Sequence, residues 1–334
     1  MIQVVGACAA GALALGGIGL SAVGGTLFDF ALNPRAKRSI MARINSGAAS
    51  GLDASVFAAD PFRQEALTWF EEAKRPSEVP AFDHGTVHGW HVWGRGVVPG
   101  EDGRRSSAST DTEHRYLIMC HGYSGRPSDL CREALMAHRA GYSVVLPAAR
   151  GHEANSDRYV GMGWLDAKDL LQWIQFVIDF DPEARIALYG VSMGGAEVMM
   201  ASGLDLPAQV KCIVEDCGYT SVWDEFAVQM GNIMHLPVHP LLDAADAVCR
   251  MRAGYGFKEA SAVAQLAHAR VPMLFLHGSA DTFVPFWMHD AVYEACASPQ
   301  KEKVAFEGAG HGASSYAQPE RYWQTVSGFL SRHL

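Results

Sequence analysis

Short apolar runs recur along the chain after residue 114. They lie at residues 116–120, 143–146, 186–189, 210–214, 273–276 and 304–306. Runs that are apolar throughout suit strands buried on both faces of a sheet. Helical patterns separate the runs, most clearly at residues 164–178, where Leu170, Ile174 and Val177 lie on one stripe. This alternation predicts an α/β fold with a mostly parallel central sheet and helices on both faces.

The chain before residue 114 has a less regular pattern. Phe62, Ala66, Leu67 and Phe70 are spaced as on an amphipathic helix that docks on the main domain. Residues 85–93 predict a strand pair, and residues 100–113 are a polar, turn-rich insertion expected to form an exposed hairpin loop. We therefore divide the chain into a segment 1–28, a linker with an amphipathic helix at 29–76, and a main domain at 77–334.

The first segment is apolar and carries no charge from Ile2 to Phe28. A helix of about 20 residues crosses the hydrocarbon core of a bilayer, so residues 1–28 predict a single-pass membrane anchor. A secretion signal, or a helix too weakly hydrophobic to insert stably, remains as an alternative. Four basic residues follow the span and favour a cytoplasmic catalytic domain: Arg35, Lys37, Arg38 and Arg43.

Small residues also form a stripe along this segment. They lie three or four positions apart, at Gly6, Ala10, Ala14, Gly17, Ser21 and Gly25. Such a stripe lets two spanning helices pack closely, so a homodimer through the anchor is a further expectation.

Composition narrows the classes of protein that the chain can belong to. Hydrophobic residues make up 49% and charged residues 19%, which excludes intrinsic disorder. The net charge of −9 argues against a nucleic-acid partner, because such binding needs a basic face. The seven cysteines form no CxxC pair, and the histidines show no HExxH spacing, so we expect no metal site and no disulfide framework.

The residues after the run at 186–189 carry a nucleophile motif. They read Gly190-Val191-Ser192-Met193-Gly194, a G-x-S-x-G between a predicted strand and a predicted helix. The sharp turn at such a serine leaves no room for side chains two residues away, which glycine relieves. Ser192 is therefore the candidate nucleophile.

A serine nucleophile needs a base that takes its proton and an acid that orients the base. Asp281 follows the run at 273–276 and His311 follows the run at 304–306, in the order Ser, acid, His of the hydrolases. Glu215 and Asp216 follow an earlier strand and are rival acids, and we favour Asp281.

The charge on a tetrahedral intermediate needs main-chain donors. The amide of Met193 is one candidate, at the start of the helix after the nucleophile. The second is the amide of Tyr123, in the loop His121-Gly122-Tyr123-Ser124-Gly125 that follows the first buried strand. His121 and Gly122 of this loop are also candidate substrate-binding residues.

Seven sequence segments together resemble a known superfamily. They are HGYSG (121–125), RGH (150–152), GMGWLDAKDLLQWI (161–174), GVSMGG (190–195), EDCGYTSVWDEF (215–226), HGSADTFVP (277–285) and GAGH (308–311). The chain resembles α/β-hydrolases of the serine esterase and lipase type, most closely the membrane-anchored bacterial hydrolases of the serine aminopeptidase-like and fermentation-switch esterase-like group. The resemblance implies an α/β-hydrolase fold with catalytic Ser192, Asp281 and His311. Glu153-Ala154 departs from the glycine and serine that often follow RGH, so substrate preference does not carry over there.

The resemblance also implies a small helical lid, which we place at residues 218–268. This stretch is apolar, and Met230 and Met234 are candidate residues of an acyl pocket because methionine adapts to varied shapes. The expected function is hydrolysis of small-molecule carboxylic esters with small or medium acyl groups, without a cofactor. The alternatives are a peptidase of the aminopeptidase type, a thioesterase or an amidase on the same residues. A catalytically silent, membrane-tethered binding protein is the alternative outside this chemistry.

Overall fold

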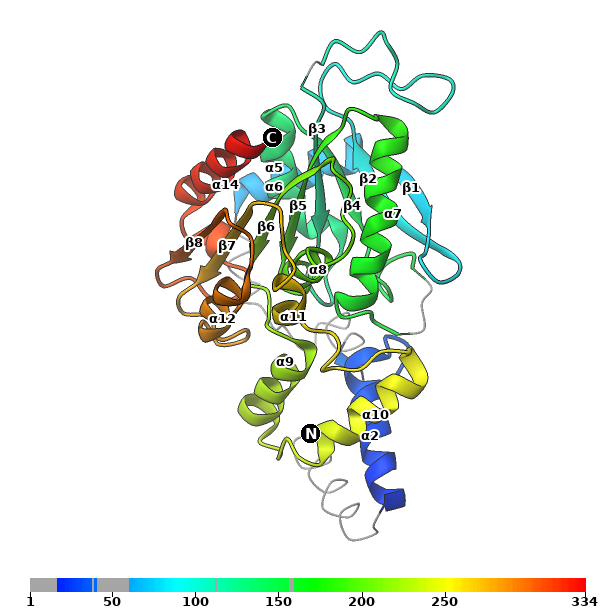
Figure 1. The fold of residues 1–334 in the computed structure, drawn as a ribbon, viewed down its shortest axis with the longest axis vertical. Helices are drawn as coiled ribbons and strands as arrows, with labels where there is room; N and C mark the ends of the chain where they lie inside the picture. The colour runs from blue at the N-terminus through cyan, green and yellow to red at the C-terminus, as the bar shows by residue number, and fades with distance from the viewer. Residues whose placement is uncertain (1–16, 38, 41–59, 112, 156–158) are drawn as a thin grey trace.

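A computed structural model describes residues 17–37, 39–40, 60–111, 113–155 and 159–334. Within these residues eight strands form one sheet, in the order β1-β2-β4-β3-β5-β6-β7-β8 (Figure 1). The strands are β1 (Arg75–Pro80), β2 (Thr86–Val92), β3 (Arg115–Cys120), β4 (Ser143–Pro147), β5 (Arg185–Val191), β6 (Val210–Asp216), β7 (Met273–Gly278) and β8 (Lys301–Phe306). The pairs β1–β2 and β2–β4 are antiparallel, and all later pairs are parallel. The predicted mostly parallel sheet is confirmed.

Helices cover both faces of this sheet (Figure 1). One face packs against α5 (Pro61–Ala73), α6 (Cys131–Arg139) and α14 (Pro319–His333), and the other against α7 (Trp164–Phe180), α8 (Met193–Ala201), α11 (Ala262–Leu266) and α12 (Trp287–Ala295). Strand β3 shows why two cores form. Ile118 and Cys120 enter one core, and Leu117 and Met119 enter the other, because successive side chains of a strand point to opposite faces.

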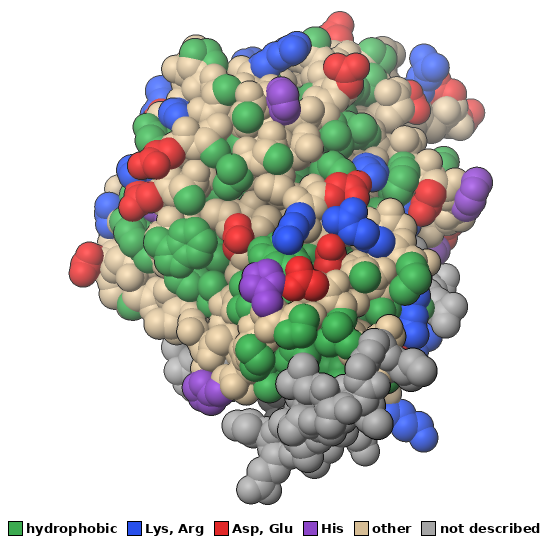
Figure 2. Space-filling model, turned by 60° about the horizontal axis from the view of Figure 1, so that its bottom comes forward, with side chains coloured by type: hydrophobic (Ala, Val, Ile, Leu, Met, Phe, Trp, Pro, Cys, Tyr) green, Lys and Arg blue, Asp and Glu red, His purple; other side chains and the backbone are tan. Residues whose placement is uncertain are grey.

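Two further helices and a π-helical turn extend from one end of the sheet, within the predicted lid at 218–268. They are α9 (Val222–Gln229), η2 (Met230–Met234) and α10 (Leu241–Ala253) (Figure 1). This end of the molecule presents hydrophobic side chains interspersed with acidic and basic ones (Figure 2). The remaining short helices are η1 (Pro127–Leu130) and α13 (Ser314–Ala317).

The predicted membrane anchor is not supported by the part of it that the structure describes. Residues 17–28 belong to α2 (Gly17–Leu32), which runs beside the lid helix α10 (Figure 1). Phe28 and Leu32 are fully buried against protein, and a Cβ on Gly24 would lie 2.6 Å from the main-chain carbon of Ala244. Within the described residues no helix is long and apolar enough to cross a membrane.

The other part of the predicted anchor is its first sixteen residues. Residues 1–16 lie outside the described residues, with half of the small-residue stripe, namely Gly6, Ala10 and Ala14. Homodimerisation through the stripe stays a prediction.

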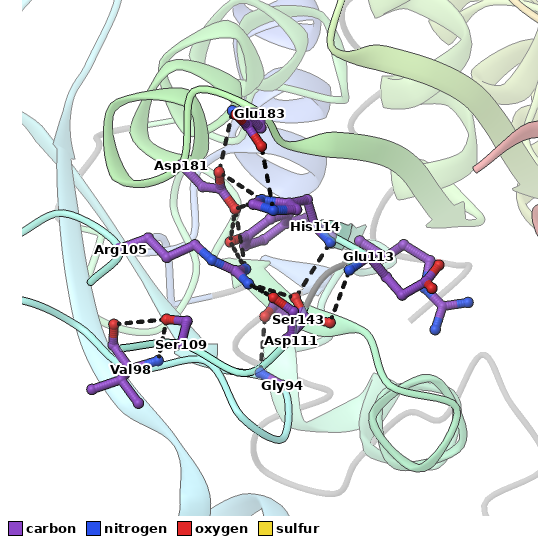
Figure 3. Close-up of polar contacts among 12 residues, drawn as sticks. Gly94, Val98, Arg105, Ser109, Asp111, Glu113, His114, Ser143, Asp181 and Glu183 are labelled. Carbon is purple, nitrogen blue, oxygen red and sulfur yellow. Dashed lines mark hydrogen bonds and ion pairs between the residues drawn. The ribbon is translucent and has the colours of Figure 1, made fainter. Parts of the chain in front are cut away.

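The polar insertion after β2 is mostly exposed, as predicted, and one of its side chains is buried. Arg105 lies in it with a side chain only 7% exposed, and its guanidinium pairs with Asp111 at 2.9 Å and with Asp181 at 3.2 Å (Figure 3). Asp181, at the end of α7, also accepts hydrogen bonds from the Tyr116 hydroxyl at 2.7 Å and pairs with His114 at 2.8 Å. These contacts fasten the insertion to the end of the sheet far from the lid.

Candidate active site

Ser192 sits on a strained turn between β5 and α8. Its φ of 58° and ψ of −117° lie where few non-glycine residues are found, which is expected of a nucleophile held on a sharp strand-to-helix turn. The glycines on either side are required by close packing: a Cβ on Gly190 would lie 2.0 Å from the carbonyl oxygen of Gly194. A Cβ on Gly194 would lie equally close to that of Cys120. The motif therefore forms the turn that its sequence predicts.

The structure brings the three candidate catalytic side chains into one hydrogen-bonded line. Ser192 Oγ lies 2.8 Å from His311 Nε2, and His311 Nδ1 lies 2.7 Å from Asp281 Oδ2. Asp281 Oδ1 accepts two main-chain N–H groups, from Phe283 at 2.9 Å and Val284 at 3.0 Å. Because both carboxylate oxygens are held, the aspartate fixes the imidazole with Nε2 toward the serine.

A second histidine, which the sequence analysis did not single out, also contacts the aspartate. His277, at the end of β7, is fully buried, with Nε2 3.2 Å from Asp281 Oδ2 and 2.9 Å from the carbonyl oxygen of Val284. Burial raises the pKa of Asp281, but hydrogen bonds from His277 and His311 outweigh burial and bring this pKa to about 2. The signal in the sequence is the histidine four residues before the acid in HGSAD.

The two rival acids lie next to the site but have other partners. Burial raises the pKa of Glu215 to about 8 and that of Asp216 to about 6. Glu215 accepts the N–H of Gly218 at 3.0 Å, and Asp216 accepts the hydroxyl of Ser314 at 3.3 Å. His311 Nδ1 instead donates its hydrogen bond to Asp281, the acid favoured from the sequence.

The loop after β3 lies directly against the nucleophile. A Cβ on Gly122 would lie 3.3 Å from the Cβ of Ser192, so only glycine gives the loop this close approach. Met193 is the first residue of α8, and its N–H therefore has no partner within the helix. The loop after β3 and the start of α8 thus meet beside Ser192, and an oxyanion hole made by the main-chain N–H groups of Met193 and Tyr123 stays a prediction.

His121 supports this loop and does not face a substrate. It is 1% exposed, and its Nε2 accepts the N–H of Ala149 at 3.0 Å, so Nδ1 carries the proton and donates to the carbonyl of Gly122 at 2.8 Å. Burial lowers the pKa of His121 to about 3, which keeps the ring neutral. The predicted substrate-binding role of His121 is therefore replaced by a structural one, because both ring nitrogens are used by the main chain.

His152, from the RGH segment, has an equivalent role. Its Nε2 accepts the N–H of Ser124 at 3.0 Å, and its Nδ1 donates to the carbonyl of Arg150 at 2.9 Å. Burial lowers the pKa of His152 to about 4. Two neutral histidines thus hold the loop at Gly122 and Ser124.

The lid methionines lie in the turn η2. Met230 is only 4% exposed and belongs to the hydrophobic core, while Met234 is partly buried against that core. The lid is joined to the catalytic acid loop by Gln229, whose side-chain N–H donates to Glu225 at 2.6 Å and to the carbonyl of Phe283 at 2.8 Å. An acyl-pocket role for Met230 and Met234 stays a prediction.

One group of side chains in the described chain has the composition of a metal site. Potential ligand atoms of Cys217, Asp281 and His311 lie within 4.8 Å of one another. Asp281 and His311 already bond each other, and burial together with the charges of Asp216 and Asp281 raises the pKa of the Cys217 thiol. Because Asp281 and His311 already bond each other, this group fits the hydrogen-bonded catalytic line.

The sheet order, the strained serine turn and the Ser–His–Asp line define an α/β-hydrolase of the serine type. Comparison with known proteins gives the family. Residues 129–334 match the model of the prolyl oligopeptidase family. This is more than half of the chain, and the chain belongs to that family.

Individual relatives are distant. The uncharacterized protein YqkD of Bacillus subtilis (strain 168) is 24% identical over 260 residues, covering 78% of this chain and 81% of its own. The Pyrococcus furiosus esterase Pf2001 superimposes with a TM-score of 0.58 at 19% identity, over 78% of this chain and 91% of its own. The Pyrococcus horikoshii acylaminoacyl peptidase has a TM-score of 0.54 at 16% identity, over 78% and 42%. These likenesses confirm the predicted superfamily and fold.

Proposed function

We propose that the protein is a serine hydrolase that cleaves carboxylic esters of small or medium acyl groups through an acyl-enzyme at Ser192. The observation that carries the proposal is the continuous line from Ser192 Oγ through His311 to Asp281, with distances of 2.8 Å and 2.7 Å. A serine hydroxyl is a weak nucleophile until a positioned base removes its proton, and this line supplies that base.

The geometry supports a two-step reaction. Ser192 Oγ attacks the acyl carbonyl carbon while His311 Nε2 accepts the hydroxyl proton, and the N–H groups of Tyr123 and Met193 stabilise the oxyanion. The tetrahedral intermediate collapses as His311 returns the proton to the leaving alcohol. Water then attacks the acyl-enzyme with His311 again as the base, which releases the acid and restores Ser192. Each step uses side chains and main-chain amides of this chain.

The test is labelling and kinetics of the purified protein. We expect a fluorophosphonate probe to label the wild type at Ser192 and Ser192→Ala to abolish both labelling and hydrolysis of short 4-nitrophenyl esters. The matched control is Ser331→Ala, which removes a hydroxyl bonded only to its own helix at 2.8 Å and should leave both unchanged. An unlabelled wild type would refute the proposal and favour a catalytically silent binding protein.

A second candidate is a peptidase on the same residues. It is favoured by the prolyl oligopeptidase family match and by the likeness to an acylaminoacyl peptidase. The same relay would return its proton to an amine in place of an alcohol. A panel of matched esters, thioesters and aminoacyl amides separates the candidates through kcat/KM, and a preference for the amides would replace the esterase by the peptidase.

A further inference from the structure

The end of α2 contacts the loop that carries an oxyanion donor. The last carbonyl groups of a helix have no partner within it. Two such groups of α2 are taken up by segments that border the active site: Ala31 accepts the hydroxyl of Tyr123, and Leu32 accepts the N–H of Val160 at 2.9 Å. The helix therefore ends on two active-site segments.

The contact at Tyr123 completes the support of its loop. Tyr123 is held at its phenol by α2, and the N–H of the next residue, Ser124, is held by His152 at 3.0 Å. Ser124 has a φ of 59°, so the loop is in a conformation that a non-glycine residue adopts only when its surroundings enforce it. The amide of Tyr123 lies between these two attachments, and its direction depends on both.

The same helix is packed against the lid. Gly24 lies on α10 so closely that an added Cβ would meet Ala244 at 2.6 Å, and Asp29 pairs with Arg252 of α10 at 3.3 Å. Phe28 packs edge-on against Tyr159, with ring centroids 4.8 Å apart. One helix thus touches the lid, the loop before α7 and the oxyanion loop.

We propose that α2 is part of the substrate-binding cap, and that it positions the oxyanion loop through Tyr123 and the lid through Gly24. Tyr123 is then a positioning residue through its hydroxyl as well as a donor through its amide. The segment before the main domain sets turnover and acyl-chain preference. This inference rests on the proposed serine hydrolase function.

Two pairs of matched variants test it in the full-length protein. Tyr123→Phe keeps the main-chain amide and removes its tie to α2, and Tyr116→Phe removes a buried hydroxyl that donates to Asp181 at 2.7 Å, at the end of the sheet far from the lid. We expect Tyr123→Phe to lower kcat about tenfold with KM changed less than about twofold, a fraction of the loss seen when an oxyanion donor is removed. Tyr116→Phe should change kcat less than about twofold.

The second pair lies at neighbouring positions of α2. Gly24→Val places a Cβ against Ala244 and pushes α2 away from α10. A Cβ on Gly25 meets no atom closer than the Arg252 side chain, at 3.7 Å. Both changes cost similar helix propensity, so they differ only in the contact. We expect Gly24→Val to change the ratio of kcat/KM for 4-nitrophenyl octanoate over acetate by about threefold or more, and Gly25→Val to leave it unchanged. If Gly24→Val does not fold, Gly24→Ala makes the same clash.

Fluorophosphonate labelling of the wild type separates the possible failures. If the wild type is labelled but Tyr123→Phe matches Tyr116→Phe in kcat and the two glycine variants match in chain preference, the cap proposal is wrong and the serine hydrolase stands. If the wild type is not labelled, both proposals fall.

Discussion

A buried carboxyl on the lid makes the stability of this protein depend on pH in a direction opposite to that of a salt-bridged acid. Glu225 on α9 is 4% exposed. Its Oε1 accepts the side-chain N–H of Gln229 at 2.6 Å, and its Oε2 has no hydrogen-bond partner in the described chain. Burial raises the pKa of Glu225 from 4.5 to about 8, aided by the nearby charge of Asp281. The native protein therefore holds this proton at neutral pH.

The sign and size follow from proton linkage. Between the unfolded value of 4.5 and the native value of about 8, the unfolded chain binds fewer protons at this site than the native one, so the free energy of unfolding falls as pH rises. A tenfold change in proton affinity corresponds to about 1.4 kcal/mol, so ionising Glu225 in the native state costs about 5 kcal/mol. Glu225→Gln has the shape of the protonated acid and cannot ionise, and it removes this cost.

Urea unfolding at several pH values measures the effect. We expect the stability of Glu225→Gln minus that of the wild type to grow by about 3 to 4 kcal/mol from about pH 5 to about pH 9. Glu307→Gln, at an exposed carboxylate, should give a difference that stays flat. A difference for Glu225→Gln that does not change with pH would refute the reasoning, because it would mean that the native carboxyl is already ionised.

Three further substitutions probe the catalytic line. Gly122→Ala adds a Cβ 3.3 Å from that of Ser192. We expect kcat for ester hydrolysis to fall about tenfold or more while circular dichroism shows an intact fold. An unchanged kcat would mean that the loop can move to accommodate the methyl group without loss of function. His277→Leu removes a donor that holds the Asp281 carboxylate, so kcat for ester hydrolysis should fall about tenfold with little change in KM, and His277→Gln, which keeps an N–H donor, should largely restore it. Asp281→Asn should lower kcat about 10⁴-fold, and a loss under about tenfold would point back to a rival acid.

The parallel part of the sheet was predictable because the burial of each strand shows in the strand's own residues. A strand covered by helices on both faces has an apolar run, as residues 116–120 of β3 and 273–276 of β7 do. Their carboxyl ends meet at one edge, so the residues after them converge without further information. Ser192, Asp281 and His311 were found in this way.

The antiparallel edge was harder to place. Strand β1 reads RPSEVP, with two prolines and no apolar run, and pairs on one side only, with β2. An edge strand can contain proline because one row of its N–H groups needs no partner. The sequence therefore indicated a strand pair at 85–93, whereas β2 lies there and β1 begins at Arg75.

His277 was not singled out for a related reason. The HGSAD segment shows only that a histidine precedes the acid by four residues. Its role depends on the turn after β7, which folds Asp281 back until its carboxylate is 3.2 Å from the His277 ring. That distance is a property of the turn and of Val284, whose carbonyl orients the ring at 2.9 Å.

The N-terminal segment shows that an apolar pattern alone does not distinguish a membrane helix from a helix packed against protein. Lipid and a protein surface select the same side chains, and a run rich in glycine and alanine satisfies either. What distinguishes α2 is one-sidedness: Phe28 and Leu32 are fully buried, whereas Thr26 faces solvent. Asp29, the first charge after the run, marked the end of the predicted span, yet in the structure it pairs with Arg252 of the lid. A charge that ends an apolar run can therefore mark a contact made by the helix within the fold. The sequence pattern does not reveal this contact, because Arg252 lies more than two hundred residues from Asp29.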